Sequence, residues 1–272
     1  MTDTAEALER IDLTRYADAD GRLDTRILLG SFETDLWMPR IRAGTIGQWS
    51  MRVIATHSTR GYWGTLYNTF GTALLIGPGT GNATSWMTTT PWEIESQEIG
   101  IRAAHGHTVV LGLGMGWQAA NVALNPAVEA VTVVESDKGA LALAATQDIF
   151  AQLPPEAQAK IKLIEANAHT FKPEGSVDTL LADLWEQTFA PDRIDEMRRI
   201  HDNIAADAIY FWGQEIQIWR TACERHGENP TLDWPLVRTI ARDFALPLIL
   251  PDWPDYPQNI ATAGDWWGPR TA

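Results

Sequence analysis

Apolar residues recur in short blocks along the second half of the chain, and stretches of helix-forming residues separate them. The blocks are rich in Val, Ile and Leu, as in the strands of a parallel sheet that is covered on both faces. They predict strands at residues 108–111, 131–134, 161–165, 177–182, 208–212 and 246–250. Helices are predicted at residues 118–124, 139–153, 191–206, 213–226 and 233–244. This alternation predicts an α/β fold with a mostly parallel, doubly wound sheet.

Residues 34–90 have a different pattern, with short pieces rich in Thr, Trp, Tyr and Gly. MRVIATHS, GYWGTLYNTFGTALLIG and ATSWMTT favour strands, and GPGTGN at residues 77–82 favours a hairpin turn. Residues 1 to about 30 carry few apolar anchors and predict a short helix followed by a loosely held arm. We therefore expect an N-terminal arm with a small β-rich domain over residues 1–90 and an α/β domain over residues 91–272.

A helix start is predicted where the two parts meet. Thr90 is a suitable cap, Pro91 suits the first helical position, and Glu93 is placed to complete a capping box. The same helix carries Gln97 and further glutamates, and some of these side chains are candidates to face a ligand.

The composition narrows the function classes. The chain of 272 residues has 21 basic and 35 acidic side chains, a formal charge of −14, which argues against nucleic acid as a partner. No apolar run approaches the ~20 residues that span a bilayer, and the acidic start lacks the apolar core of a signal peptide, so we expect no membrane contact and a cytoplasmic location. The single cysteine, Cys223, excludes an internal disulfide, and the histidine spacing predicts no metal site.

The glycine-rich turn at residues 112–116 follows an apolar strand and precedes a helix. Three glycines leave backbone bare beside a helix N-terminus, where a nucleotide-like ligand can lie close. Glu135 ends the next strand, 23 residues after Gly112, near the distance expected of a carboxylate that binds ribose hydroxyls. Trp117 stands where a dinucleotide-binding loop has its last glycine, which argues against NAD or FAD.

Four positions follow the ends of consecutive predicted strands: Gly112, Glu135, Asn167 and Asp183. The carboxyl ends of parallel strands meet at one edge of a sheet, where ligands of such folds bind. We therefore expect these positions to converge on one crevice. Of the thirteen tryptophans, most are predicted to pack in the core, and a few near the loop are candidates for an aromatic wall around a cationic sulfonium or an amine.

At these residues the chain resembles class I S-adenosylmethionine-dependent methyltransferases. The similar segments are VVLGLGMGW, VTVVESD, KLIEANA and VDTLLADLW, which together with the strand that follows span residues 107–212. The resemblance implies a Rossmann-like methyltransferase fold with S-adenosylmethionine as cofactor and a small-molecule substrate, and it leaves a homodimer open. It implies that the ligand contacts are Gly112, Leu113, Gly114, Met115 and Gly116 for the methionine portion, Glu135 and Ser136 for the ribose, Asn167 and Ala168 for the adenine, and Asp183 beside the substrate.

A narrower resemblance is to spermidine synthase-like proteins, which place a small β domain and a Glu-bearing helix, here TPWEIESQE, before the glycine loop. The chain has Met115 where those enzymes carry an aspartate, and Asp183-Leu184-Trp185-Glu186 where they carry a D-x-x-D-P-like element. Methyl transfer is therefore the first hypothesis, with Asp183 as the candidate base and Glu186 next. An aminopropyltransferase and a non-catalytic binding or scaffold protein are the alternatives. The Pro- and Trp-rich tail from residue 251 is predicted to form no long helix and to act as a lid or a packing strap.

Overall fold

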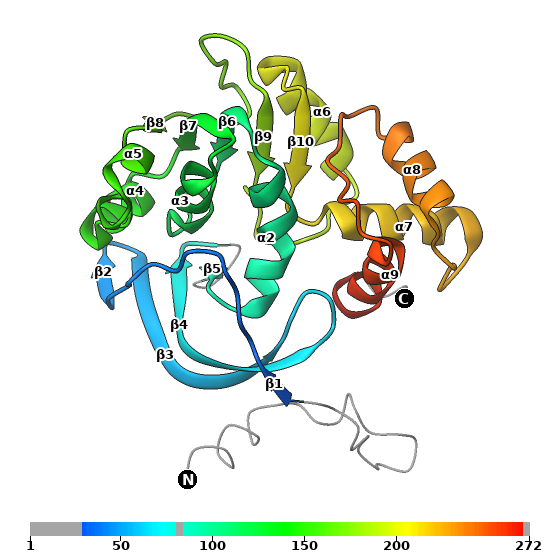
Figure 1. Cartoon of the computed structure of the whole chain (residues 1–272), viewed down its shortest axis with the longest axis horizontal. Helices are drawn as coiled ribbons and strands as arrows, with labels where there is room; N and C mark the ends of the chain where they lie inside the picture. The colour runs from blue at the N-terminus through cyan, green and yellow to red at the C-terminus, as the bar shows by residue number, and fades with distance from the viewer. Residues whose placement is uncertain (1–28, 80–83, 269–272) are drawn as a thin grey trace.

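The computed structural model describes residues 29–79 and 84–268, which form two sheets. Helices flank the parallel sheet, and the N-terminal sheet lies below them in the view of Figure 1. The arm predicted at the N-terminus lies almost entirely outside the described residues. The strands are β1 (Leu29–Ser31), β2 (Gly44–Ile46), β3 (Trp49–Arg60), β4 (Leu66–Gly77), β5 (Thr84–Thr88), β6 (Gly106–Leu111), β7 (Val128–Glu135), β8 (Ile161–Glu165), β9 (Thr179–Ala182) and β10 (Ala208–Phe211). The helices are α2 (Pro91–Ala103), α3 (Trp117–Leu124), α4 (Lys138–Gln147), the 3-10 helix η2 (Phe150–Gln152), α5 (Pro155–Gln158), α6 (Arg193–Ile204), α7 (Gln214–His226), α8 (Trp234–Asp243) and α9 (Tyr256–Trp267).

The second half of the chain forms a parallel sheet with the strand order β10-β9-β6-β7-β8. The α/β fold expected from the apolar blocks is thus confirmed, and its order and connections are those of a Rossmann-like sheet. From β6 the chain moves outward through β7 to β8, and it then returns to place β9 on the other side of β6. This reversal creates a switch point at the carboxyl end of β6, where α/β sheets bind ligands.

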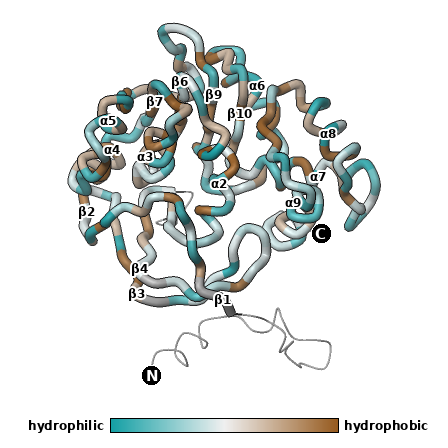
Figure 2. The backbone as a smooth tube through the Cα atoms, viewed as in Figure 1, coloured by the Kyte–Doolittle hydropathy of each residue, from teal (hydrophilic) through white to brown (hydrophobic). Residues whose placement is uncertain are grey.

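Both faces of the parallel sheet are buried, as its apolar strands require. Along β6, Val109 and Leu111 join an apolar cluster with α6, whereas Val110 joins the cluster that contains α2 and α3 residues. Successive side chains of a strand point to opposite faces, so a strand that is covered on both sides needs apolar residues throughout. Figure 2 shows the corresponding hydrophobic colours along the central strands, whereas the colours along β3 and β4 are mixed.

The first half of the described chain forms a second sheet, in which β2, β3, β4 and β5 are antiparallel neighbours and β1 pairs in parallel with β4. The β-rich character expected before residue 90 is confirmed. In Figure 1 the long β3–β4 ribbon curves below the helices of the other half. Trp49 and Met87 of this sheet share one apolar cluster with Leu113 and Trp117, so the two sheets bury a common core. The domain boundary near residue 90 remains a prediction.

Helix α2 begins as the sequence predicts, with Pro91 in its first turn and the Thr90 hydroxyl accepting a hydrogen bond from the Glu93 backbone N–H at 3.4 Å. The second half of the expected capping box is wrong. The Glu93 carboxyl accepts a hydrogen bond from the Thr88 N–H at 3.3 Å instead of returning to Thr90. The side chain of Glu93 is therefore buried toward the interior of the site described below.

Three further expectations need correction. Residues 246–250 form no strand, because only an isolated parallel bridge joins Leu248 to Ile209 of β10. The helix expected over 139–153 ends at Gln147, because Asp148 takes a left-handed conformation, with φ +51°, before η2. The tail was expected to form no long helix, yet Tyr256–Trp267 forms the 12-residue helix α9, with its proline in the first turn where the missing N–H does no harm. In the described part of the chain, every helix is too short or too polar to cross a bilayer.

Glu215 of α7 is fully buried and lies among three tyrosines. The hydroxyls of Tyr62 and Tyr256 donate to its carboxyl at 3.1 and 2.8 Å, and the Tyr210 hydroxyl lies 3.2 Å away. Tyr210 also donates to the Ser96 carbonyl at 2.7 Å. The cluster joins the β3–β4 turn, β10, α7 and α9. Burial raises the pKa of Glu215 to about 7, since a charged carboxylate loses its hydration there.

This raised pKa predicts a pH-dependent stability. The folded protein holds the Glu215 proton up to about pH 7, whereas an unfolded chain releases it near pH ~4.3. The contribution of this group is therefore complete below that lower pH and is lost as the pH rises toward the folded pKa, by on the order of 3 kcal/mol. Denaturant titrations between pH 4 and 8 should show that Glu215→Gln removes this part of the decline. The exposed Glu156→Gln is the control, and curves that stay parallel for Glu215→Gln and the wild type would contradict the prediction.

Candidate active site

A cavity of about 260 Å³ lies at the carboxyl ends of β6, β7 and β9, between the parallel sheet and the N-terminal strands. The glycine loop, the end of β7 and the residues after β9 supply one side of it. Strands β3 to β5 supply the other. Its described lining residues are Trp49, Leu75, Pro78, Trp86, Met87, Gln97, Gly112, Leu113, Gly114, Gln118, Glu135, Ser136, Asp137, Ala140, Asp183, Leu184 and Trp185.

The glycine loop passes close to two other segments of the chain. Gly112 has a φ of +94°, and a Cβ placed there would collide with the backbone carbonyl oxygen of Asp183. Gly114 has a φ of +51°, and its Cβ would lie 2.6 Å from the Met87 sulfur. Only a residue without a Cβ adopts these angles at no cost and lets the Asp183 carbonyl and the Met87 sulfur pack this close to the loop. The loop therefore offers bare backbone to the cavity between β9 and β5.

The Glu135 carboxylate connects two loops at the floor of the cavity. One oxygen accepts the Leu113 N–H at 3.1 Å, and the other accepts the N–H groups of Ser136 and Asp137 at 2.7 and 2.8 Å. A carboxylate has about four acceptor positions, so it can receive a further donor from a ligand. Its place at the end of β7, next to the switch point, is the one that the sequence predicts.

Two tryptophans from the N-terminal sheet form the opposite wall. Trp49 donates its indole N–H to Asp137 at 2.8 Å, and its ring lies 6.0 Å from that of Trp86. Asp137 also accepts the N–H groups of Gly139 and Ala140 and so caps α4. One carboxylate therefore fixes both the first turn of α4 and the aromatic wall that faces it.

A buried amide stands between two carboxyl groups at the end of β9. The Gln97 side-chain nitrogen donates to Asp183 at 2.8 Å and to Glu93, one turn earlier on α2. Burial raises the pKa of Asp183 to about 7, although the charge of Arg193 and the bond from Gln97 oppose the shift. Burial, followed by the nearby Asp183 charge, raises the pKa of Glu93 well above its usual range. The pKa of Asp183 therefore lies near neutral pH, and the pKa of Glu93 is shifted in the same upward direction.

Arg193, which is only 2% exposed, contacts the segment that follows Asp183. Its guanidinium carbon lies 3.8 Å from the centre of the Trp185 ring, and one nitrogen donates to the Gln187 carbonyl at 3.1 Å. Trp185 in turn donates to Glu196 at 2.9 Å. Burial lowers the pKa of Arg193 to about 10, so the group stays charged near neutral pH. These contacts fix Trp185 as part of the cavity wall.

The structure brings together six of the residues that the sequence indicates, and they line the cavity: Gly112, Leu113, Gly114, Glu135, Ser136 and Asp183. The other five lie outside its described lining. Met115 and Gly116 turn toward the interior of the fold, Ala168 is buried, Asn167 is exposed and accepts the His169 N–H, and Glu186 lies beside Gly79. The roles of all eleven residues remain predictions.

The sequence did not indicate the residues of the N-terminal strands that close the cavity, chiefly Trp49, Trp86 and Met87. The abundance of tryptophan near turns was the available signal.

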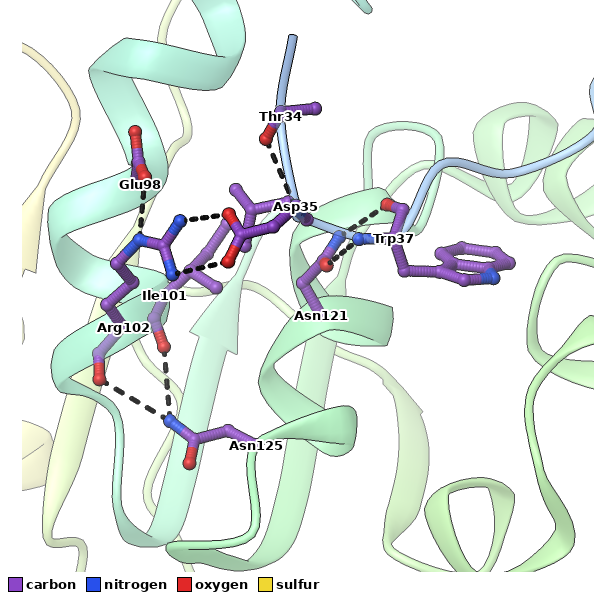
Figure 3. A network of polar contacts seen from close by, with 9 residues as sticks. Thr34, Asp35, Trp37, Glu98, Ile101, Arg102, Asn121 and Asn125 are labelled. Atoms are coloured by element: carbon purple, nitrogen blue, oxygen red, sulfur yellow. Dashed lines mark hydrogen bonds and ion pairs between the residues drawn. The ribbon is translucent and has the colours of Figure 1, made fainter.

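Trp117, at the place of a missing glycine, is buried and donates to the Trp37 carbonyl at 2.9 Å. Asn121 exchanges hydrogen bonds with the Trp37 backbone at 2.8 and 3.0 Å, as Figure 3 shows. The start of α3 therefore holds the chain segment that precedes β2.

No protein-family model and no curated protein matches this chain. Among solved structures, the glycopeptide N-methyltransferase MtfA complexed with S-adenosyl-L-methionine is 19% identical, with a TM-score of 0.31, over 40% of this chain and 48% of that one. A DhpI–SAH complex is 13% identical, with the same TM-score, over 43% and 54% of the two chains. The methyltransferase SibL in its apo form is 18% identical, again at 0.31, over 41% and 31%. The matched part of this chain thus covers about half or less of the length of these proteins. Similarity this low does not show what the chain does, so its function is inferred from the geometry of the site.

The close approach at Gly112 predicts the effect of adding one methyl group. Gly112→Ala should lower the free energy of unfolding by at least ~2 kcal/mol beyond the cost of a positive φ, since the clash is with backbone. Gly227→Ala is the matched control, because Gly227 has a φ of +89° and open space around its Cβ position. Denaturant unfolding of both variants measures the difference. Equal losses would show that β6 and β9 do not constrain the loop as described.

Proposed function

We propose that the chain is an S-adenosylmethionine-dependent methyltransferase that acts on a small-molecule acceptor. The observation that carries the proposal is the meeting of the bare glycine loop, the Glu135 carboxylate and Asp183 in one cavity at the switch point of a Rossmann-like sheet. The N-terminal strands and α2, which precede the glycine loop and cover it, support a spermidine synthase-like arrangement as part of the proposal.

The residues present fit the cofactor. The backbone of Gly112, Leu113 and Gly114 lines the cavity, and Glu135 keeps an acceptor position for a ribose hydroxyl. The indole rings of Trp49 and Trp86 provide a polarizable wall for a sulfonium, which aromatic faces attract. The described lining contains no basic side chain, which favours a cationic ligand centre over a pyrophosphate.

The chemistry that the cofactor supplies when bound is an activated methyl group. The protein then has to align the acceptor, exclude water and accept a proton where the acceptor carries one. Asp183 is suited to take that proton, because its side chain lines the cavity and its pKa of about 7 lets it act as a base near neutral pH. The Gln97 amide holds the Asp183 carboxylate in place and donates to Glu93 from the same nitrogen.

Ligand titration tests the cofactor assignment. In calorimetry, S-adenosylmethionine and S-adenosylhomocysteine should bind, and Glu135→Gln should weaken both by roughly 10-fold or more, since one charged hydrogen bond is worth ~1.5–3 kcal/mol. Glu165→Gln is the matched control, because Glu165 pairs with Glu135 in the strand register but lies outside the described cavity lining.

The other outcomes of this titration have distinct meanings. Preference for the decarboxylated cofactor would favour aminopropyl transfer. Absence of binding by all three compounds would favour a non-catalytic scaffold and end the enzyme proposal.

The raised pKa of Asp183 predicts the pH profile of the reaction. The base works when ionised, so the rate below pH 7 should rise about 10-fold per pH unit and level off above the pKa of about 7. Formation of S-adenosylhomocysteine with a panel of small amines and alcohols measures this. Asp183→Asn should lower the rate by ~10²–10⁴-fold and abolish the pH dependence. A profile unchanged in that variant would exclude Asp183 as the base.

A further inference from the structure

A second hollow, of about 790 Å³, lies beside another face of α2 and is open to solvent. We call it the aromatic–acidic cleft and define it by the rings and carboxyl groups that line it. Residues 32–35, the β3–β4 ribbon, α2 and the chain before α9 all contribute to its walls. Its rings are those of Phe32, Trp63, Tyr67 and Trp253, and its carboxyl groups are those of Glu33, Asp35, Glu95 and Glu98. It shares no described lining residue with the candidate active site.

Glu95 is the informative residue of this cleft, because it is only 6% exposed. Its two oxygens accept hydrogen bonds from the Tyr67 hydroxyl at 3.0 Å and the Trp63 N–H at 3.1 Å. Burial raises the pKa of Glu95 above its usual value, and these donors oppose the shift because they favour the ionised carboxylate. Both donors are neutral, and the charged group that acts most strongly on it is another carboxylate, Glu98. Within the described residues no cationic side chain forms an ion pair with Glu95, so a cation in the cleft would favour its ionised form.

The remaining charges leave the cleft strongly negative. Arg102 forms ion pairs with both Asp35 and Glu98, so one guanidinium serves two carboxylates, as Figure 3 shows. Glu33 is exposed. None of the described residues that line the cleft is a lysine, an arginine or a histidine. Electrostatic complementarity therefore selects a positively charged ligand.

The rings decide what kind of cation fits. Phe32 and Tyr67 form an edge-to-face pair with centroids 5.1 Å apart, and Trp63 and Trp253 form another at 6.2 Å. Aromatic faces attract ammonium groups, whereas a hard metal ion requires several oxygen ligands at short range. We propose that the aromatic–acidic cleft is a second binding site, which takes a small organic cation of the ammonium class. Its ligand lies against the tryptophan and tyrosine rings with its charge toward Glu95.

Calorimetric titration of the full chain with tetramethylammonium chloride tests this site, with the neutral isostere tert-butanol as the ligand control and sodium chloride held constant. Tetramethylammonium should bind and tert-butanol should bind at least 10-fold more weakly. Glu95→Gln should weaken binding at least 5-fold, and the exposed Glu33→Gln should weaken it to a smaller extent. Glu129→Gln removes an exposed charge elsewhere on the surface and should leave binding unchanged.

The same titration shows whether tetramethylammonium binds in the aromatic–acidic cleft or in the candidate active site. Asp183→Asn should bind tetramethylammonium as the wild type does, whether or not the chain binds S-adenosylmethionine. Absence of binding, equal binding of the neutral isostere, or equal weakening by Glu95→Gln and Glu129→Gln would each overturn the proposal. If Glu95→Gln fails to fold, judged by its unfolding curve, then Trp253→Leu and Glu33→Gln carry the test, and wild-type affinity in both would overturn it.

Discussion

The crossing of the glycine loop over the carboxyl end of β9 is the constraint on which the site depends. Gly112 follows β6 and packs directly against the Asp183 carbonyl, while the Asp183 N–H donates to the Leu111 carbonyl at 2.9 Å. Strands β6 and β9 are neighbours because the chain reverses direction between them. The glycine loop and Asp183, the candidate base, are therefore held in register by the hydrogen bonds between β6 and β9. A site built on paired strands holds its groups more precisely than one built on loops alone.

Helix α2 connects this arrangement with the rest of the molecule. It places Glu93 and Gln97 against Asp183 on one side and Glu95 against the β3–β4 turn on another. Buried polar groups are stable only where their hydrogen bonds are satisfied, so each of these side chains requires a specific neighbour. The N-terminal strands are consequently part of the site. Met87 and Trp49 cover the glycine loop and the end of β7, and Glu95 holds the turn from which both long strands extend.

The sequence predicted the parallel sheet well because its signal is local. Apolar blocks, a glycine turn and an acidic strand end are all read within a few residues, and their meeting at one edge follows from parallel pairing. Prediction from the sequence failed where the local structure depends on contacts with residues far away in the chain. Residues 246–250 look like a strand, yet β10 accepts only one bridge there. The tail looked irregular because of its prolines, but the first turn of α9 tolerates Pro257, and burial of Tyr256 against Glu215 stabilises that helix.

The same reasoning explains why the far wall of the cavity escaped prediction. Trp49 and Trp86 come from antiparallel strands whose position over the parallel sheet is set by tertiary packing, about which local periodicity carries no information. Trp117 shows the coupling most clearly. Its indole occupies the position of a glycine that a dinucleotide-binding helix needs for close packing, and it anchors Trp37 of the segment before β2. The residue that argues against a dinucleotide in the sequence therefore also anchors the segment that leads into the N-terminal strands. The shape of the cavity is determined by how those strands lie.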